Sequence, residues 1–194
     1  MTIAEYIKCA IDAYEQDKLQ SALLHACAAV DGTASKLFPN VKDNRARFVN
    51  TIERCLWVVE PMLGLGINLE TTEFSWIVLN KQPPQFSQIV YEIFRCNLAH
   101  GTEIPLGFSL ELRKSDQWRC CKLGPQKMVL PDTLIFSLMS IAVFSSVNIG
   151  QHLGGTYHLS HADKEFVIDE WWGREADARA YFNTVKMPRV TMQW

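Results

Sequence analysis

The chain contains 194 residues, of which 48% are hydrophobic and 21% are charged, and its formal net charge is −2. This length fits one domain, and the hydrophobic content excludes an intrinsically disordered chain. The weakly negative charge excludes a protein that is basic over its whole surface, although a local basic segment remains compatible with it.

The first sixty residues predict three helices. Thr2 and Glu5 have the spacing of a capping box, which opens the first helix. Apolar positions recur every three or four residues, and the third helix is expected to stop at Pro61. Asp31 precedes Gly32 within the second helix, so it either marks a break or faces an arginine of a neighbouring element. The expected ranges are about 2–16, 17–38 and 41–60.

The next predicted helix follows two prolines, at 83 and 84, and ends at Gly101, a residue that readily adopts the left-handed cap conformation. Three polar side chains, Arg95, Asn97 and His100, interrupt its apolar pattern near the end. The apolar positions fill about 220° of the helical wheel, wider than the stripe of an ordinary surface helix. We therefore expect this helix to bury two sides, one within its own chain and the other in a homodimer. The second side would contain Tyr91, Phe94 and Leu98. The apolar positions that define the pattern are Phe86, Ile89, Val90, Ile93 and Phe94.

Beyond Gly101 the apolar period changes from that of a helix to that of a strand. Residues 106–113 alternate, and shorter strands are expected at 118–123 and 128–130, so we predict a small antiparallel insertion over about 105–130. Asp132 is then expected to cap a helix to about Asn148, apolar on nearly all sides and thus the most buried.

The remaining residues, about 151–194, predict a short mixed appendage. Strands are expected at 157–159 and 166–168, a helix at 171–182 and a last strand from Val190. Its aromatic side chains are expected to serve as core or dimer contacts rather than to stack on bases. They are Trp171, Trp172, Tyr181, Phe182 and Trp194.

No segment predicts secretion or membrane insertion. Glu5, Lys8 and Asp12 interrupt any apolar leader, and the most apolar stretch, 134–147, is too short to span a bilayer. The six cysteines lack the spacing of a disulfide framework. We therefore predict a cytoplasmic protein without a membrane partner.

A local basic segment lies directly after the motif helix. Residues 95–127 contain six basic and three acidic side chains, a net charge of +3. Such a patch suits an anionic ligand such as RNA, although a solvated charged hairpin would give the same composition. The predicted RNA-binding residues are Arg113, Lys114, Arg119 and Lys122.

Arg95, Asn97 and His100 form the candidate catalytic group. Arginine binds a phosphate through a planar fork, and histidine exchanges protons near neutral pH. Because Arg95 and His100 are five positions apart, they lie about 140° apart on an ideal helix, and only a long arginine, a distorted helix end or two chains could bring them to one phosphate. The alternative is structural, with His100 capping its own helix and Arg95 paired with an acid such as Glu92.

Other kinds of site are less well supported by the sequence. Zinc would need Cys120 and Cys121 with His152, His158 and His161, but these lack the usual zinc-ligand spacing. The nucleophile elbow of a serine hydrolase and the glycine-rich phosphate loops are both missing. We therefore expect no metal and no cofactor.

The residues Arg95-Cys-Asn-Leu-Ala-His100 resemble the R-x(4–6)-H motif of the HEPN superfamily, as does their place on an aromatic-rich helix before a glycine. The resemblance covers mainly residues 1–150. It implies a mainly α, HEPN-like helical bundle (about 1–101 and 132–150) in a single domain, 1–194. It also implies a metal-independent RNA endonuclease of toxin or defence type, acting as a homodimer with a composite Arg/His site, and makes a cognate antitoxin a candidate partner.

Under this resemblance, the 2′-hydroxyl of RNA is the nucleophile and the products are a 2′,3′-cyclic phosphate and a 5′-hydroxyl. Asn97 would orient the phosphate or His100. Cys96 stands where active members often carry a polar residue, with Asn97 one step later. This order leaves open a non-catalytic module that binds RNA, nucleotide or a partner protein, and a purely structural homodimer.

Overall fold

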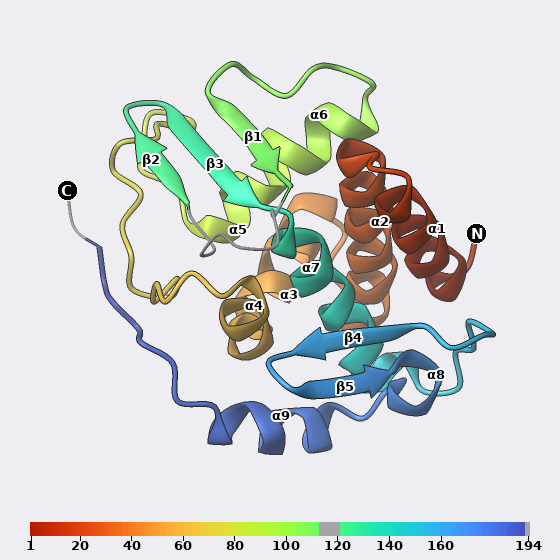
Figure 1. Cartoon of the computed structure of the whole chain (residues 1–194). Coiled ribbons are helices and arrows are strands. Elements are labelled where there is room, and N and C mark those ends of the chain that lie inside the picture. The colour runs from red at the N-terminus through yellow and green to blue at the C-terminus, as the bar shows by residue number, and fades with distance from the viewer. Residues whose placement is uncertain (113–120, 193–194) are drawn as a thin grey trace.

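The computed structural model describes residues 1–112 and 121–192. The chain opens with a helical hairpin, α1 (Ile3–Glu15) and α2 (Leu19–Leu37), whose helices lie side by side (Figure 1). The predicted capping box is confirmed, because the Glu5 amide donates to Thr2 Oγ1 at 3.1 Å and the Thr2 amide donates to Glu5 Oε2 at 2.6 Å.

The predicted helix over 41–60 is two helices, α3 (Asn44–Arg54) and α4 (Leu56–Leu63). The break is at Cys55, whose amide hydrogen bonds lead back to the Thr51 and Ile52 carbonyls in a tightened last turn. Pro61 lies inside α4 instead of ending the helix, so the prediction of that boundary was wrong.

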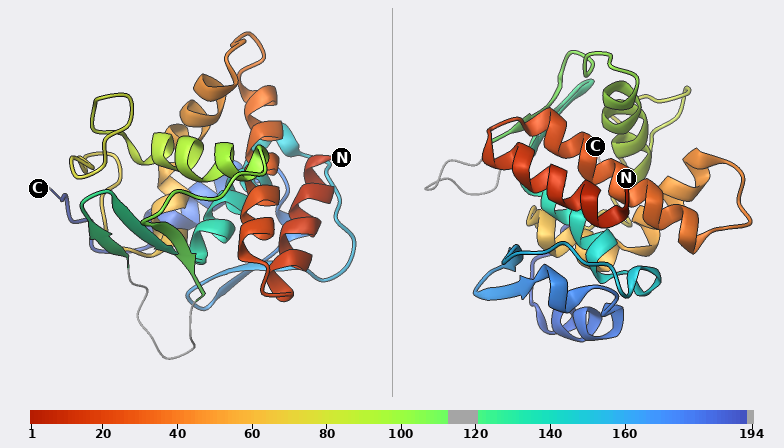
Figure 2. Two further views of the ribbon diagram at one scale, coloured as in Figure 1. Left: turned by 90° about the horizontal axis from the view of Figure 1, so that it is seen from above. Right: turned by 90° about the vertical axis from the view of Figure 1, so that its right-hand side faces the viewer.

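The predicted motif helix is present in three consecutive segments. They are α5 (Phe86–Ile89), a π-helical segment η1 (Val90–Arg95) and α6 (Cys96–Ala99). The helix ends as predicted, because Gly101 has a φ of +67°, which favours glycine. Helices α2 and α3 both pack against it, so the motif helix lies beside the N-terminal part of the chain (Figure 2).

Helix α7 (Thr133–Phe144) occupies the centre of the molecule and packs against α2 and α4. It was expected to be the most buried helix, and every residue except Phe136 is buried. Its serine hydroxyls, those of Ser137 and Ser140, donate to carbonyls three residues earlier, which satisfies polar groups inside an apolar environment. The helix predicted to run from an Asp132 cap to about Asn148 instead ends at Phe144, and Asp132 makes no side-chain capping hydrogen bond. A short 3-10 turn, η2 (Ser146–Asn148), follows it.

The first sheet contains β1 (Phe108–Glu111), β2 (Lys122–Gly124) and β3 (Lys127–Pro131) in the order β1-β3-β2. Strand β3 runs parallel to β1, with Phe108 opposite Met128, and antiparallel to β2. The antiparallel insertion predicted over 105–130 is therefore wrong, because the sheet is mixed. Strand β3 is the central strand since its apolar run is buried on both faces, whereas β1 alternates between buried and exposed positions at an edge.

The C-terminal part forms a hairpin followed by two helices. Strands β4 (His158–His161) and β5 (Lys164–Val167) pair antiparallel, and α8 (Ile168–Trp171) and α9 (Glu175–Thr184) follow. The single helix predicted over 171–182 is wrong, because the chain breaks at Gly173, whose φ is +78°.

The mainly α fold predicted as a HEPN-like helical bundle is wrong. About 51% of the chain is helical, and two small sheets make it a mixed α/β structure. The sequence misled because helical periodicity dominates its first hundred residues, while pairing between strands separated along the chain leaves no local pattern. Buried residues of both sheets, including Phe108 and Phe166, join the helices in one hydrophobic core.

Candidate functional site

A π-helical turn shapes the motif helix where its polar residues begin. The Cys96 amide donates to the Tyr91 carbonyl, five residues back instead of four. The Asn97 side-chain amide donates to the carbonyls of Glu92, at 3.1 Å, and Ile93, at 2.8 Å. Asn97 therefore provides hydrogen-bond donors to backbone carbonyls at the π-helical turn. Such π-helical turns are often found at functional sites.

The other end of the Asn97 side chain is also engaged. The Thr102 hydroxyl donates to Asn97 Oδ1 at 3.0 Å, and the Thr102 amide donates to the Asn97 carbonyl at 2.9 Å. Both ends of the Asn97 side chain thus fix the last turn and the exit of the chain. Its predicted role in orienting a phosphate would require its NH2 group, the donor, to leave the Glu92 and Ile93 carbonyls.

Arg95 reaches across to α2, where Asp31 is its partner. Its Nε and Nη2 atoms each lie 3.0 Å from Asp31 Oδ2, and the two side chains are 20% and 30% exposed. The guanidinium also lies 5.4 Å from the centre of the Tyr91 ring, within the range of a cation–π contact. Asp31 was expected either to mark a break in its helix or to face an arginine of a neighbouring element, and the second prediction is confirmed. Glu92, named as an alternative partner of Arg95, instead pairs with Arg45 at 2.6 Å.

Burial and charge act in opposite directions on this pair. Burial raises the pKa of Asp31, and the attractions of Arg95 and Arg47 only partly offset that effect. Burial would lower the pKa of Arg95, but Asp31 outweighs it and holds the pKa above its ordinary value. These two pKa shifts indicate that Asp31 and Arg95 are both partly removed from water and that Arg95 keeps its charge.

A hollow of about 430 Å³ opens beside this ion pair, between α1, α2, α3 and the motif helix. Arg95 and Asp31 line it together with Arg47 and Asn44 of α3, and Tyr6 of α1. The Arg47 guanidinium donates to Asn44 Oδ1. Two guanidinium groups and one carboxylate therefore face the same space, which is a suitable lining for an anionic ligand.

His100 lies outside this hollow, although its neighbour Ala99 lines it. It is an exposed residue at the end of α6, and its amide closes the last turn on the Cys96 carbonyl. Within the described residues, its imidazole makes no hydrogen bond or ion pair. One chain therefore brings Arg95, but not His100, to the hollow.

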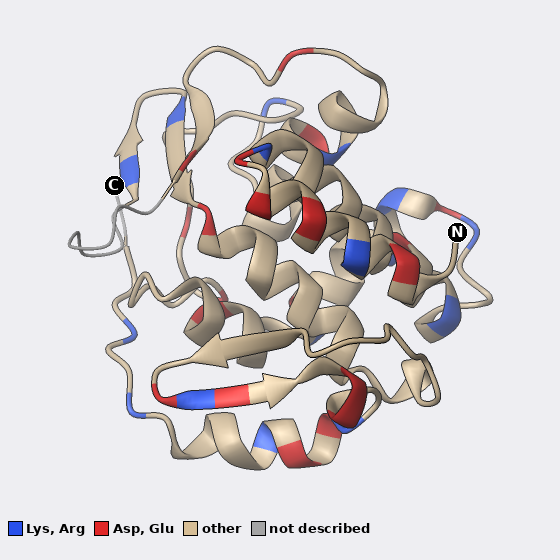
Figure 3. Ribbon diagram, turned by 45° about the vertical axis from the view of Figure 1, so that its right-hand side comes forward, with Lys and Arg blue, Asp and Glu red and all other residues tan. Residues whose placement is uncertain are grey.

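The predicted basic patch is only partly described. Arg113, Lys114 and Arg119 lie outside the described residues. Lys122, on β2, pairs with Glu111 of β1 at 2.5 Å, and both side chains are about half exposed (56% and 51%). Basic and acidic residues are interspersed along the described part of the ribbon in Figure 3.

The comparisons with known proteins place this chain in a family. The model of the Rv1289 family matches residues 2–194. The chain belongs to the Rv1289 family. Two relatives are the uncharacterised proteins Rv1289 of Mycobacterium tuberculosis and Mb1320 of Mycobacterium bovis. Each is 28% identical over 200 residues, which cover the whole of this chain and 94% of the relative. No solved structure gave a significant match.

The described part of this Rv1289-family chain contains no group of three His, Cys, Asp or Glu side chains placed to hold a metal ion. Cys120 of the predicted zinc alternative lies outside that part. His152 pairs instead with Asp169 at 2.8 Å, and His158 lies 3.9 Å from Glu165. Over the same described range, no helix is long and apolar enough to cross a membrane.

The aromatic cluster of this family member is part of the core, one of the two roles expected for it. Phe166 stacks on Phe182 with 5.9 Å between ring centres, and its ring meets that of Trp171 edge-on at 4.8 Å. Phe144 of α7 contacts all three rings, which anchors the hairpin and α9 to the central helix. Trp194 lies outside the described residues.

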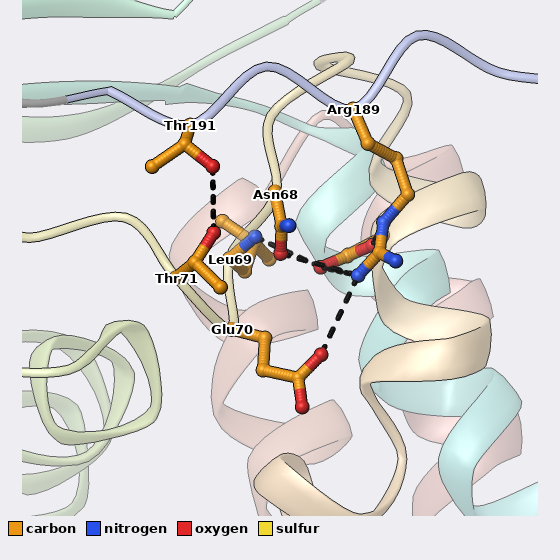
Figure 4. A network of polar contacts seen from close by, with 7 residues as sticks. Asn68, Leu69, Glu70, Thr71, Arg189 and Thr191 are labelled. Carbon is orange, nitrogen blue, oxygen red and sulfur yellow. Dashed lines mark hydrogen bonds and ion pairs between the residues drawn. The ribbon is translucent and has the colours of Figure 1, made fainter.

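A second polar network ties the C-terminal segment to the loop after α4 (Figure 4). Arg189 binds Glu60 at 2.7 Å and Asn68 at 3.1 Å, and it approaches Glu70 to 3.7 Å. Val190 forms a single parallel bridge with Ile67 in place of the last strand predicted from that residue.

This C-terminal segment borders a groove of about 470 Å³ between α4 and α9. Its charged lining residues balance in sign, so the groove offers no excess charge for recognising an anion. They are Glu53, Glu60, Glu70, Arg54, Arg179 and Arg189. The hollow at Arg95 is therefore the better candidate for binding a phosphate.

Sequence reasoning missed Arg47 and Asn44 as lining residues of the hollow. Both lie on the exposed side of an ordinary amphipathic helix, whose start is set by Asp43 accepting the Arg45 amide at 3.0 Å. Only the packing of α3 beside α2 brings them near Arg95, about fifty residues away in the sequence. Asp31, which precedes a glycine inside an apolar helix, gave the one local signal.

Proposed function

We propose that this chain is an RNA endonuclease of toxin or defence type that acts without a metal ion, through Arg95 and His100. The observation that carries the proposal is the motif pair itself: a guanidinium in a hollow with a second arginine, and an exposed histidine five residues later. The resemblance of Arg95–His100 to the HEPN motif supplies the reaction type. A cognate antitoxin is a candidate protein partner.

In the proposed reaction the 2′-hydroxyl oxygen of RNA attacks the adjacent phosphorus. The bond from phosphorus to the 5′ oxygen breaks, which leaves a 2′,3′-cyclic phosphate and a 5′-hydroxyl. Arg95 binds the phosphate oxygens and stabilises the charge that develops on them. The hydroxyl proton must be accepted and the leaving oxygen must be protonated, and His100 is the group for this proton transfer.

The proposal also requires a homodimer. Arg95 and His100 of one chain face different surroundings, so His100 of a second copy would complete the site beside Arg95. An apolar contact for such a dimer is supported by Leu98, which is only partly buried, and by Leu106, which is 101% exposed in the loop that follows the motif helix. Phe94, by contrast, is fully buried within one chain, so it cannot form the predicted second side.

A non-catalytic module that binds RNA, nucleotide or a partner protein is the second candidate. It is supported by the full engagement of Asn97 in its own helix and by the ion pair between Arg95 and Asp31. Under this alternative the hollow binds an anion, and His100 takes no part.

A cleavage assay on total RNA in the presence of EDTA tests the proposal. Arg95→Ala and His100→Ala should each lower the cleavage rate by about 100-fold or more, as expected for phosphate binding and proton transfer. Matched controls are Arg174→Ala and His158→Ala, which remove exposed side chains of the same types far along the chain. Both should cleave like wild type.

The products distinguish the two candidates. Wild-type cleavage that yields 2′,3′-cyclic phosphate ends, and that both motif variants lose while remaining folded at the assay temperature, supports the endonuclease. RNA binding without cleavage supports the binding module. Equal cleavage by wild type and both motif variants would refute the assignment of Arg95 and His100.

A further inference from the structure

The edge of Arg95 that would bind a phosphate is occupied by a carboxylate of the same chain. Nε and Nη2, the two donors of one edge of the guanidinium, both point to Asp31 Oδ2 at 3.0 Å. The contact is not sealed in the core, because it lies at the wall of the hollow and the Asp31 side chain is 30% exposed.

The hollow has a second cation whose charge is less committed. Arg47 donates to the neutral side chain of Asn44, and no carboxylate among the described residues forms an ion pair with it. Its charge acts on Asp31 across the hollow, in the same direction as that of Arg95. One carboxylate thus shares the hollow with two arginines and pairs with one of them, where these arginines would bind a phosphate.

We propose that Asp31 occupies the place of the RNA phosphate and lowers the affinity for RNA. Its ion pair with Arg95 must break before a phosphate can bind the same edge of the guanidinium. Carboxylate and phosphate bind guanidinium through the same planar geometry, so the two anions compete for it. This inference rests on the proposed function, since it takes Arg95 as the phosphate ligand.

The competition has two parts, and both weaken binding. RNA must replace the contacts that Asp31 makes with Arg95, and its phosphate must approach the negative charge of Asp31 in a site partly shielded from water. Removal of that charge while the shape of the side chain is kept should therefore tighten binding. A carboxylate that only stabilises the fold predicts a lower melting temperature without a gain in RNA affinity, because its loss leaves the Arg95 charge half-buried and unpaired.

The experiment measures binding of a fluorescent, fully 2′-O-methylated RNA oligonucleotide, which lacks the nucleophile and so reports binding without cleavage. Asp31→Asn should bind this RNA about tenfold more tightly than wild type at about 0.1 M salt. The matched control is Asp177→Asn, which removes an exposed carboxylate paired with Arg174 at 2.8 Å, away from the hollow. It should leave the affinity unchanged.

A double variant shows whether Asp31 acts through Arg95. The gain from Asp31→Asn should disappear when Arg95→Ala is also present, because no guanidinium is then released. Melting temperatures of all variants are measured alongside, and Asp31→Ser replaces Asp31→Asn if the latter does not fold.

The outcomes separate this inference from the proposed function. If wild type binds the RNA and Arg95→Ala weakens binding, but Asp31→Asn binds no more tightly than wild type, the role of Asp31 is refuted while Arg95 remains the ligand. If neither wild type nor Asp31→Asn binds the RNA, both proposals are refuted. Tighter binding by Asp31→Asn that persists without Arg95 also refutes the competition, since the effect would not pass through the guanidinium.

Discussion

Asp169 provides the most sharply defined test of how this structure is held together. Its carboxylate accepts hydrogen bonds from the Leu153 amide at 2.6 Å, the Gly154 amide at 2.9 Å and the Trp172 indole at 3.2 Å. It also pairs with His152 at 2.8 Å. Because it joins the loop before β4 to α8 and the aromatic cluster, Asp169→Asn should loosen the attachment of the C-terminal part.

The magnitude follows from which donors lose an acceptor. Leu153 and Trp172 share one carboxylate oxygen, while Gly154 and His152 share the other. An amide NH2 in place of either oxygen leaves two donors unpaired, and a hydrogen bond to a charged group contributes about 1.5–3 kcal/mol. The pair with His152 contributes little to stability, because that side chain is 78% exposed. Water can also reach this loop and replace part of the lost hydrogen bonding. We therefore expect Asp169→Asn to lower the free energy of unfolding by about 2–3 kcal/mol.

The loss should depend on pH in a defined direction. Burial would raise the pKa of Asp169, but the hydrogen bonds from Leu153, Gly154 and Trp172, with the charge of His152, hold it below its ordinary value. The ionised carboxylate therefore stabilises the folded state fully above the unfolded pKa of about 3.9, and this contribution is lost as the pH falls through the folded pKa.

Urea unfolding of wild type and Asp169→Asn at pH 7 and at pH 3 measures both effects, with Asp177→Asn as the exposed control. The difference in free energy between wild type and Asp169→Asn should be smaller at pH 3 than at pH 7. A difference of equal size at both values, or one below about 0.5 kcal/mol at pH 7, would refute the reasoning.

Two further predictions concern the motif helix. Asn97→Ala should lower the free energy of unfolding by about 1–2 kcal/mol, because the carbonyls of Glu92 and Ile93 lose their side-chain donor. Urea unfolding measures this change, and an unchanged free energy of unfolding would contradict the structural role of Asn97. Wild type should be a dimer by light scattering at micromolar concentration and Leu98→Glu a monomer, because the charge would disrupt an apolar contact; a monomeric wild type would contradict the composite site.

Local features of this protein could be predicted because they depend on residues near one another in the sequence. The Thr2–Glu5 capping box, the end of the motif helix at Gly101 and the burial of the helix after Asp132 were all predicted and are confirmed. Two short strands were also expected at 157–159 and 166–168, close to the observed β4 and β5, although their pairing as a hairpin was not. In each case the side-chain pattern and the backbone preference point to one outcome.

The pairing of strands could not be predicted in the same way. Alternation in residues 106–113 correctly indicates a strand, but it does not reveal that β3, and not β2, lies beside β1. The central position of β3 comes from burial on both faces, of Met128 and Leu130 on one face and of Val129 on the other, which depends on tertiary packing that includes α7. The fold class changed accordingly from a helical bundle to a mixed α/β structure.

The candidate site also combines features that were predictable from the sequence with features that depend on tertiary packing. The sequence by itself determined that Arg95, Asn97 and His100 share one helix and that its end is set by a glycine, because helical spacing is a local property. Only the tertiary structure decided that Arg95 meets Asp31 from 64 residues earlier, that Arg47 shares its hollow, and that His100 stays outside. The physical reason is that a charge half-removed from water requires a partner, and which partner lies within reach depends on how α2, α3 and the motif helix pack against one another.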